Sequence, residues 1–114
     1  MELLRHEARE RLIANGHAAQ AGTVRLGELV PVVRLYLGDG RGQWLLAALD
    51  PADEDRAYGL VQLGIQAPHF AAVRLSDLPA LQGMFDTPVQ RDRYFRPRQS
   101  LAHFASDPRP RRGD

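Results

Sequence analysis

Residues 31–75, PVVRLYLGDGRGQWLLAALDPADEDRAYGLVQLGIQAPHFAAVRL, decide the fold. They contain four runs of six or seven mostly apolar or aromatic residues, bounded by Gly, Pro or Asp, which is typical of strands and too short for helices. The runs are residues 32–37, 43–49, 58–63 and 70–75. The glycines between residues 38 and 42 tolerate positive φ and predict a hairpin between the first two runs. With polar turns at 50–55 and 65–69, the stretch predicts an antiparallel meander.

Side chains alternate across a strand, so each run has two faces. One predicted face is entirely apolar and is expected to be the core side: Val33, Leu35, Leu37, Leu45, Ala47, Leu49, Val61, Leu63, Ala71, Val73 and Leu75. The other is mixed: Val32, Arg34, Tyr36, Trp44, Leu46, Ala48, Tyr58, Leu60, Gln62, Phe70, Ala72 and Arg74.

The mixed face is a candidate binding surface. Aromatic rings stack on nucleobases and guanidinium groups neutralise phosphates, so its aromatic and basic residues favour single-stranded nucleic acid. These candidate residues are Arg34, Tyr36, Trp44, Tyr58, Phe70 and Arg74. The alternative is that the N-terminal helix or residues 99–106 cover this face.

The flanking segments predict helices. Residues 2–15 place Leu4, Ala8 and Leu12 on one helical face, with Gly16 as the expected stop and residues 17–30 as a loop. Ser76 is the expected N-cap of a short helix over residues 77–84. Residues 91–96 are expected to add an edge strand, and residues 99–106 a further short helix with Leu101 and Phe104 facing inward.

The chain is therefore expected to be a single α+β domain over residues 1–106. Its mainly antiparallel sheet has four to five strands, with an N-terminal helix and one or two short C-terminal helices. A length of 114 residues suits one domain, and a hydrophobic content of 44% argues against general disorder. Residues 107–114 are rich in Pro and Arg and are expected to form a disordered basic tail.

Charge is distributed unevenly. Residues 1–90 carry eight arginines and eleven acidic residues, a net charge of −3, whereas residues 91–114 carry seven arginines and three acidic residues, a net charge of +4. All basic residues other than histidine are arginine. Arg91, Arg93, Arg96 and Arg98 lie within eight residues and are candidate polyanion-binding groups.

The residue patterns argue against several chemistries. The chain has no cysteine, so it has no thiolate nucleophile and no thiolate metal ligand. The three serines are not placed beside a base on a strand-to-helix elbow, and the acidic residues 50–55 lack the spacing of a calcium loop. We therefore expect no enzymatic activity, no metal and no cofactor. No apolar run is long enough to span a bilayer, so a cytoplasmic protein without membrane contact is expected.

The order of several motifs resembles a family of small bacterial proteins known as domain of unknown function 2958. The matching stretches are residues 12–16, 31–37, WLLAALDP at 44–51, AYGLVQLG at 57–64, LSDL at 75–78, PVQRDRYFRP at 88–97 and residues 100–105. The resemblance implies a cytoplasmic accessory protein of mobile DNA, on a plasmid, phage or integrative element, and it supplies no catalytic residues. This chain departs from the family pattern at Ala47 and Ala48 and at residues 69–72, where relatives carry acidic residues and a tyrosine.

The expected function is that of a non-enzymatic binding protein of a mobile genetic element. Its partner is a protein or a nucleic acid, and weak binding of single-stranded nucleic acid is the candidate activity. The alternative is a protein-binding inhibitor or modulator of a host defence system, of the anti-restriction or anti-CRISPR type. The sequence leaves the oligomeric state open.

Overall fold

The computed structural model describes residues 4–38, 40–64, 66–78 and 88–106, and it confirms the α+β class. The described elements, in chain order, are α1 (His6–Gln20), η1 (Leu26–Glu28), β1 (Val33–Leu37), β2 (Gly42–Asp50), β3 (Asp53–Leu63), β4 (His69–Arg74), η2 (Leu75–Asp77), β5 (Val89–Arg91) and α3 (Leu101–Ser106). The predicted disordered tail, residues 107–114, lies outside the described residues.

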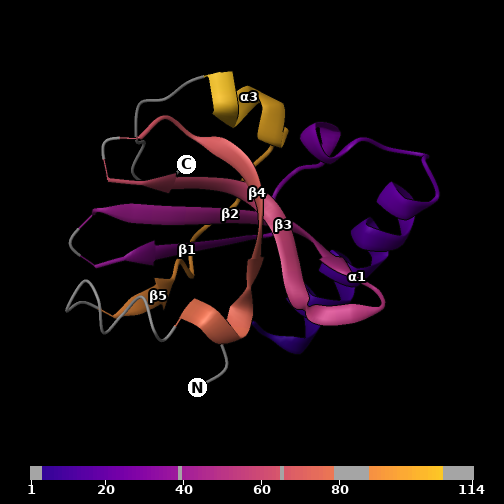
Figure 1. Ribbon diagram of the computed structural model, residues 1–114, viewed down its shortest axis with the longest axis horizontal. Helices are drawn as coiled ribbons and strands as arrows, with labels where there is room; N and C mark the ends of the chain where they lie inside the picture. The colour runs from indigo at the N-terminus through magenta and orange to yellow at the C-terminus, as the bar shows by residue number, and fades with distance from the viewer. Residues whose placement is uncertain (1–3, 39, 65, 79–87, 107–114) are drawn as a thin grey trace.

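The five strands form one antiparallel sheet in the order β4-β3-β2-β1-β5 (Figure 1). The first four strands are consecutive neighbours, so the predicted meander is confirmed. A fifth strand was expected over residues 91–96, but β5 instead ends at Arg91 and pairs with β1. The residues that follow β5 are thereby free to form a turn at the edge of the sheet.

Two tight turns shape the meander. Gly40 has a φ of 82°, which suits glycine, and its amide donates to the carbonyl of Leu37 at 2.9 Å. Between β2 and β3, the Asp50 carboxylate accepts from the Ala52 amide at 2.9 Å. This local bond shortens the turn to Pro51 and Ala52. The prediction of a polar turn over residues 50–55 is therefore too long, and β3 begins at Asp53.

Helix α1 continues through the predicted stop at Gly16 and ends at Gln20. Gly16 is buried, and a Cβ atom built there would overlap the carbonyl oxygen of Leu49 in β2. The glycine therefore allows close approach of helix and sheet instead of ending the helix. The predicted loop over residues 17–30 is corrected as well, because it includes the end of α1 and all of η1.

Ser76 lies within η2 and binds Asp55 on β3. Its amide donates to Asp55 Oδ1 at 2.9 Å and its hydroxyl donates to Oδ2 at 2.7 Å. The carboxylate thus fixes the end of β4 against β3. Most of the short helix predicted over residues 77–84 lies outside the described residues. The second predicted C-terminal helix is confirmed as α3, with Leu101 fully buried.

The predicted faces of β2 are partly wrong. Leu35 pairs with Trp44, so Trp44 and Leu46 share a face with Val33, Leu35 and Leu37, whereas Leu45 and Ala47 lie on the opposite face. Pairing with β3 then shifts by one residue between Leu46 and Ala48, which marks a β-bulge. The extra residue returns Leu49 to the face on which it was predicted.

The two faces of the sheet carry separate apolar clusters. Leu4 and Leu12 of the α1 region pack with Trp44, Leu46 and Leu49 on one face. On the other face, the main buried members are Leu29, Leu45, Ala47, Ala48, Leu60, Phe95 and Leu101, which come from the sheet, the η1 and α3 regions and the segment after β5. Figure 1 shows α1 and α3 at different sides of the sheet. Phe95 therefore anchors the arginine-rich segment to the core.

Candidate nucleic-acid interface

The predicted aromatic surface is not formed as a single face. Trp44 is only 1% exposed and packs in the cluster beneath α1, so the prediction that it shares a face with Tyr36 and Phe70 is wrong. Tyr58 packs against the cluster on the other face, and its hydroxyl donates to Asp50 at 3.4 Å. The register in which β2 pairs with β1 determines the face on which Trp44 lies, and the sequence pattern did not define this register.

Arg74, another predicted binding residue, is already paired with acidic side chains. Its guanidinium group forms ion pairs with Asp53 at 3.4 Å and with Asp55 at 3.3 Å. The side-chain hydroxyl of Ser76, its amide and Arg74 all lower the pKa of Asp55, with the hydroxyl bond as the largest cause. This end of the sheet is therefore a compact polar cluster in which Arg74 already has two acidic partners.

A chain of polar contacts crosses β5, β1, β2 and β3 on the face opposite α1. Arg34 donates to Gln43 at 2.8 Å, and Gln43 donates to Gln62 at 3.3 Å. Tyr36 donates to Gln90 at 3.0 Å, and the guanidinium carbon of Arg34 lies 4.7 Å from the centroid of the Tyr36 ring. Arg34 and Tyr36 are therefore joined, as predicted for the same face, but their polar groups are engaged with neighbouring strands.

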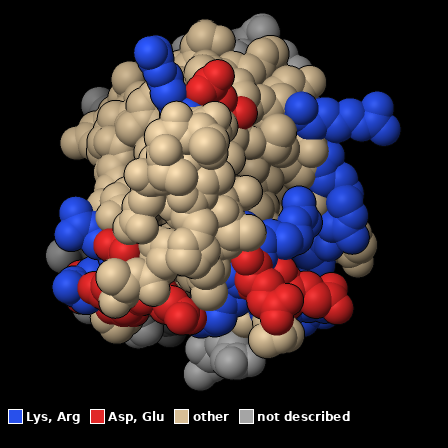
Figure 2. Space-filling model, turned by 90° about the vertical axis from the view of Figure 1, so that its right-hand side faces the viewer, with Lys and Arg blue, Asp and Glu red and all other residues tan. Residues whose placement is uncertain are grey.

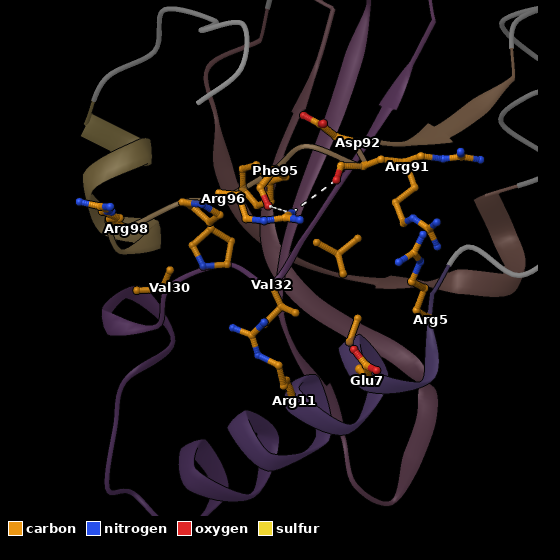
Figure 3. Close-up of a pocket in the computed structure, with 15 residues that line it drawn as sticks. Arg5, Glu7, Arg11, Val30, Val32, Arg91, Asp92, Phe95, Arg96 and Arg98 are labelled. Carbon is orange, nitrogen blue, oxygen red and sulfur yellow. Dashed lines mark hydrogen bonds between the residues drawn. The ribbon is translucent and has the colours of Figure 1, made fainter.

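The four predicted arginines of the C-terminal segment line a hollow, which we call the arginine pocket. It has a volume of about 460 Å³ and lies between the start of α1, residues 30–33 and residues 91–98 (Figure 3). Six arginines line it: Arg5, Arg11, Arg91, Arg93, Arg96 and Arg98. Its apolar lining is Ala8, Val30, Pro31, Val32, Val33, Phe95 and Pro97. The lining of the pocket is therefore both basic and apolar.

Few acids balance the charge of the arginine pocket. Among the described residues, Glu7 and Asp92 are the only acids that line it, so six positive charges face two negative ones, a local excess of four. Asp92 is already paired with Arg34 at 3.2 Å. Among the residues that the structure describes, none of the six arginines forms an ion pair with a carboxylate. Arginine stays protonated at any ordinary pH, so this excess is permanent.

Figure 3 shows how the walls of the arginine pocket face each other. Arg5 and Arg91 reach toward one another, from the residue before α1 and from the end of β5. Arg11 projects from α1 toward the segment that carries Arg96, whereas Arg98 points away from the centre of the hollow. Converging guanidinium groups repel one another unless an anion lies between them. The arginine pocket is therefore a candidate site for an anion.

Arg5 and Arg11 are functional candidates that the sequence pattern missed. They lie about eighty residues before the arginine-rich segment, and nothing in their spacing indicates the contact. The pairing of β5 with β1 brings the two regions together, because it places residue 91 beside Leu35. The pocket could be predicted from the sequence only if the pairing of β5 with β1 were predicted first.

Asp92 holds the segment after β5 in place. Its amide donates to the carbonyl of Arg34 at 2.9 Å, and its carboxylate accepts from Arg34 Nη1 and from the Tyr94 amide, the latter at 2.9 Å. Arg96 then donates to the carbonyls of Phe95 at 2.9 Å and Arg93 at 3.4 Å. The segment is therefore a braced turn whose arginines have defined positions.

The wider surface shows the same segregation of charge. On the side of the molecule in Figure 2, basic and acidic side chains surround a broad uncharged centre, and basic ones form a band along the right.

Among the described residues, no group of three or more His, Cys, Asp or Glu side chains gathers as metal ligands. In the same part of the chain, no helix is long and apolar enough to cross a membrane.

Fold and site together define a class: a small α+β protein with a five-stranded antiparallel sheet and an arginine-lined pocket at one edge. The family model described as "Protein of unknown function (DUF2958)" matches residues 3–112. The chain belongs to this family, as the order of its motifs predicted. No curated protein and no solved structure was found to match it. Ala48 and Ala72, two positions at which a departure from the family pattern was expected, both pair with Tyr58 in the sheet.

Proposed function

We propose that the protein is a non-enzymatic binding protein that holds the phosphate backbone of single-stranded nucleic acid in the arginine pocket. The observation that carries the proposal is a hollow of about 460 Å³ lined by six arginines, none of which has an acidic partner among the described residues. A guanidinium group binds phosphate through paired N–H donors, and several together release condensed counterions from a polyanion.

The shape of the arginine pocket favours a single strand over a duplex. Its lining includes apolar groups such as Val30, Val32 and Pro97, which have no complementary surface on the charged exterior of a double helix. A single strand presents unstacked bases and sugars beside its phosphates. The setting we propose, an accessory protein of a plasmid, phage or integrative element acting in the cytoplasm, rests on the family resemblance alone.

The test is a titration of a labelled single strand at two salt concentrations. We expect binding to weaken steeply with salt, and the variant Arg5→Gln/Arg91→Gln to bind less tightly, with a salt slope reduced by about 0.7 for each phosphate that the variant no longer neutralises. Arg25→Gln/Arg56→Gln also removes two positive charges, from exposed positions outside the pocket, and is the matched control. If both variants weaken binding equally, binding depends on overall charge and the pocket has no role.

A chain ending at Ser106 tests the tail separately, because it removes Arg109, Arg111 and Arg112. We expect this shortened chain to retain most of its affinity and to remain sensitive to Arg5→Gln/Arg91→Gln. Absence of binding by the full-length protein at low salt contradicts the proposal. An acidic protein partner, as in modulation of a host defence complex, then becomes the better hypothesis for the same pocket.

A further inference from the structure

Tyr94 is the most exposed large apolar side chain in the described part of the protein. It is 84% exposed, compared with 46% for Phe70 and 39% for Val30. A single exposed aromatic residue is common on protein surfaces. Tyr94 differs from such residues by its position, because Arg93 and Phe95 on either side of it both line the arginine pocket.

The exposure of Tyr94 is imposed by the turn that carries it. The Tyr94 amide donates to Asp92 Oδ1 at 2.9 Å, while Asp92 Oδ2 accepts from Arg34 on β1. On the other side, Phe95 is only 5% exposed and packs in the cluster beneath α3. Asp92 and Phe95 are therefore both anchored, and the chain between them holds the Tyr94 side chain out in solvent.

An aromatic ring held in this way is preorganised for stacking. The ring loses little freedom on binding because its backbone is already fixed, which lowers the entropic cost of a contact. Nucleobases stack on exposed aromatic rings with little dependence on base identity. Of the four residues Arg93, Tyr94, Phe95 and Arg96 in the braced turn, only Phe95 is buried, so the exposed Tyr94 ring lies between two exposed arginines in the sequence.

We infer that Tyr94 stacks on one base of the strand whose phosphates lie in the arginine pocket. The inference rests on the proposed function, and it adds to it the group that contacts the base. It implies that a polyanion without bases binds in the arginine pocket without contacting Tyr94. It also implies a preference for single strands, because a paired and stacked base is not available to the ring.

The experiment compares two probes: a fluorescently labelled strand of about twelve thymidines, and inorganic polyphosphate as a competitor without bases. We expect Tyr94→Ala to weaken binding of the thymidine strand about tenfold, and Tyr94→Phe and Tyr94→Trp to retain it. The dissociation constant of polyphosphate, obtained from this competition after allowing for the affinity of the labelled strand, should be equal for the wild type and Tyr94→Ala. His103→Ala, which removes an exposed aromatic imidazole ring from α3, outside the braced turn, is the matched control and should bind as the wild type does.

The possible outcomes distinguish a failure of the stacking role of Tyr94 from a failure of the proposed function. Unchanged binding of the thymidine strand by Tyr94→Ala overturns the stacking role and leaves the proposed function intact. Equal weakening of both probes also overturns it, because the substitution then acts on the pocket as a whole. Absence of binding by the wild type at low salt is a failure of the proposed function itself. Far-UV circular dichroism of each variant checks that the fold is unchanged.

Discussion

At the scale of single residues, several carboxylates act as structural connectors in this protein. Asp55 links β3 to η2 through both the amide and the hydroxyl of Ser76. Asp92 links β1 to the arginine-rich turn in the same way, through a side chain and an amide. A carboxylate accepts several hydrogen bonds at once, so one residue is enough to fix a chain crossing.

Ser76→Ala should raise the pKa of Asp55 toward its ordinary value, because the hydroxyl bond is the largest cause of the lowered pKa. A carboxyl group whose pKa is lower in the folded state stabilises the fold at pH values above its unfolded pKa. The stability difference between wild type and variant should therefore be present at neutral pH and disappear as the pH falls through the folded pKa.

The measurement is an NMR titration of the Asp55 carboxyl carbon in both proteins. Ser100→Ala is the matched control, because the Ser100 side-chain oxygen accepts a hydrogen bond from the amide of His103, in the α3 region. It should leave the Asp55 titration unchanged. A pKa of Asp55 that is the same with and without the Ser76 hydroxyl would show that the bond is not formed in solution.

At the scale of elements, the bulge in β2 and the helix α1 fit each other. Ala47, the extra residue of the bulge, is fully buried, and its carbonyl accepts a hydrogen bond from the Asn15 side chain of α1 at 2.9 Å. The helix can approach β2 this closely because Gly16, the residue after Asn15, has no side chain. The helix thus supplies the hydrogen bond that the irregular strand lacks.

Asn15→Ala should lower the free energy of unfolding by about 1–2 kcal/mol, because it leaves the buried carbonyl of Ala47 without this donor. Gln20→Ala is the matched control on the same helix. Gln20 donates to Asp50 at 3.3 Å in an exposed position, so its loss should change stability by less than about 0.5 kcal/mol. Urea unfolding of both variants gives the comparison, and equal effects would contradict the role given to the bulge.

The elements also show what was predictable from sequence. Apolar runs between Gly, Pro and Asp predicted the four-stranded meander, because strand length and turn residues are local properties. The faces of β2 were mispredicted because one bulge residue changes the alternation, and Trp44 was thereby placed on the wrong side. Gly16 was misinterpreted as a helix stop because its role depends on Leu49, which is distant in sequence. The arginine-rich segment was recognised from composition, whereas Arg5, Arg11 and Tyr94 required the fold.

At the scale of the whole molecule, the sheet joins all the described elements into one unit. Its two apolar clusters lie on opposite faces of the same strands, with Leu45 and Leu46 of β2 belonging to different clusters. Loss of β2 therefore exposes both clusters at once. This arrangement predicts cooperative unfolding of the helices and the sheet.

The single tryptophan provides the test of this cooperativity. Trp44 is 1% exposed, so its fluorescence reports on the cluster beneath α1, whereas far-UV circular dichroism reports on all helices and strands. The two signals should give the same denaturant midpoint, because both clusters depend on β2. A tryptophan transition that precedes the circular dichroism transition would show that α1 separates from the sheet first.

The arginine pocket is assembled from both ends of the described chain, residues 5–11 and residues 91–98, with residues 30–33 between them. During synthesis its first arginines emerge well before the last, by roughly 5–15 s at ordinary rates of translation. Throughout that interval the nascent chain lies beside ribosomal RNA and messenger RNA, themselves dense polyanions. Because the basic groups come together only when β5 pairs with β1, the unfinished chain presents isolated arginines, and the pocket forms only after residues 91–98 have been synthesised.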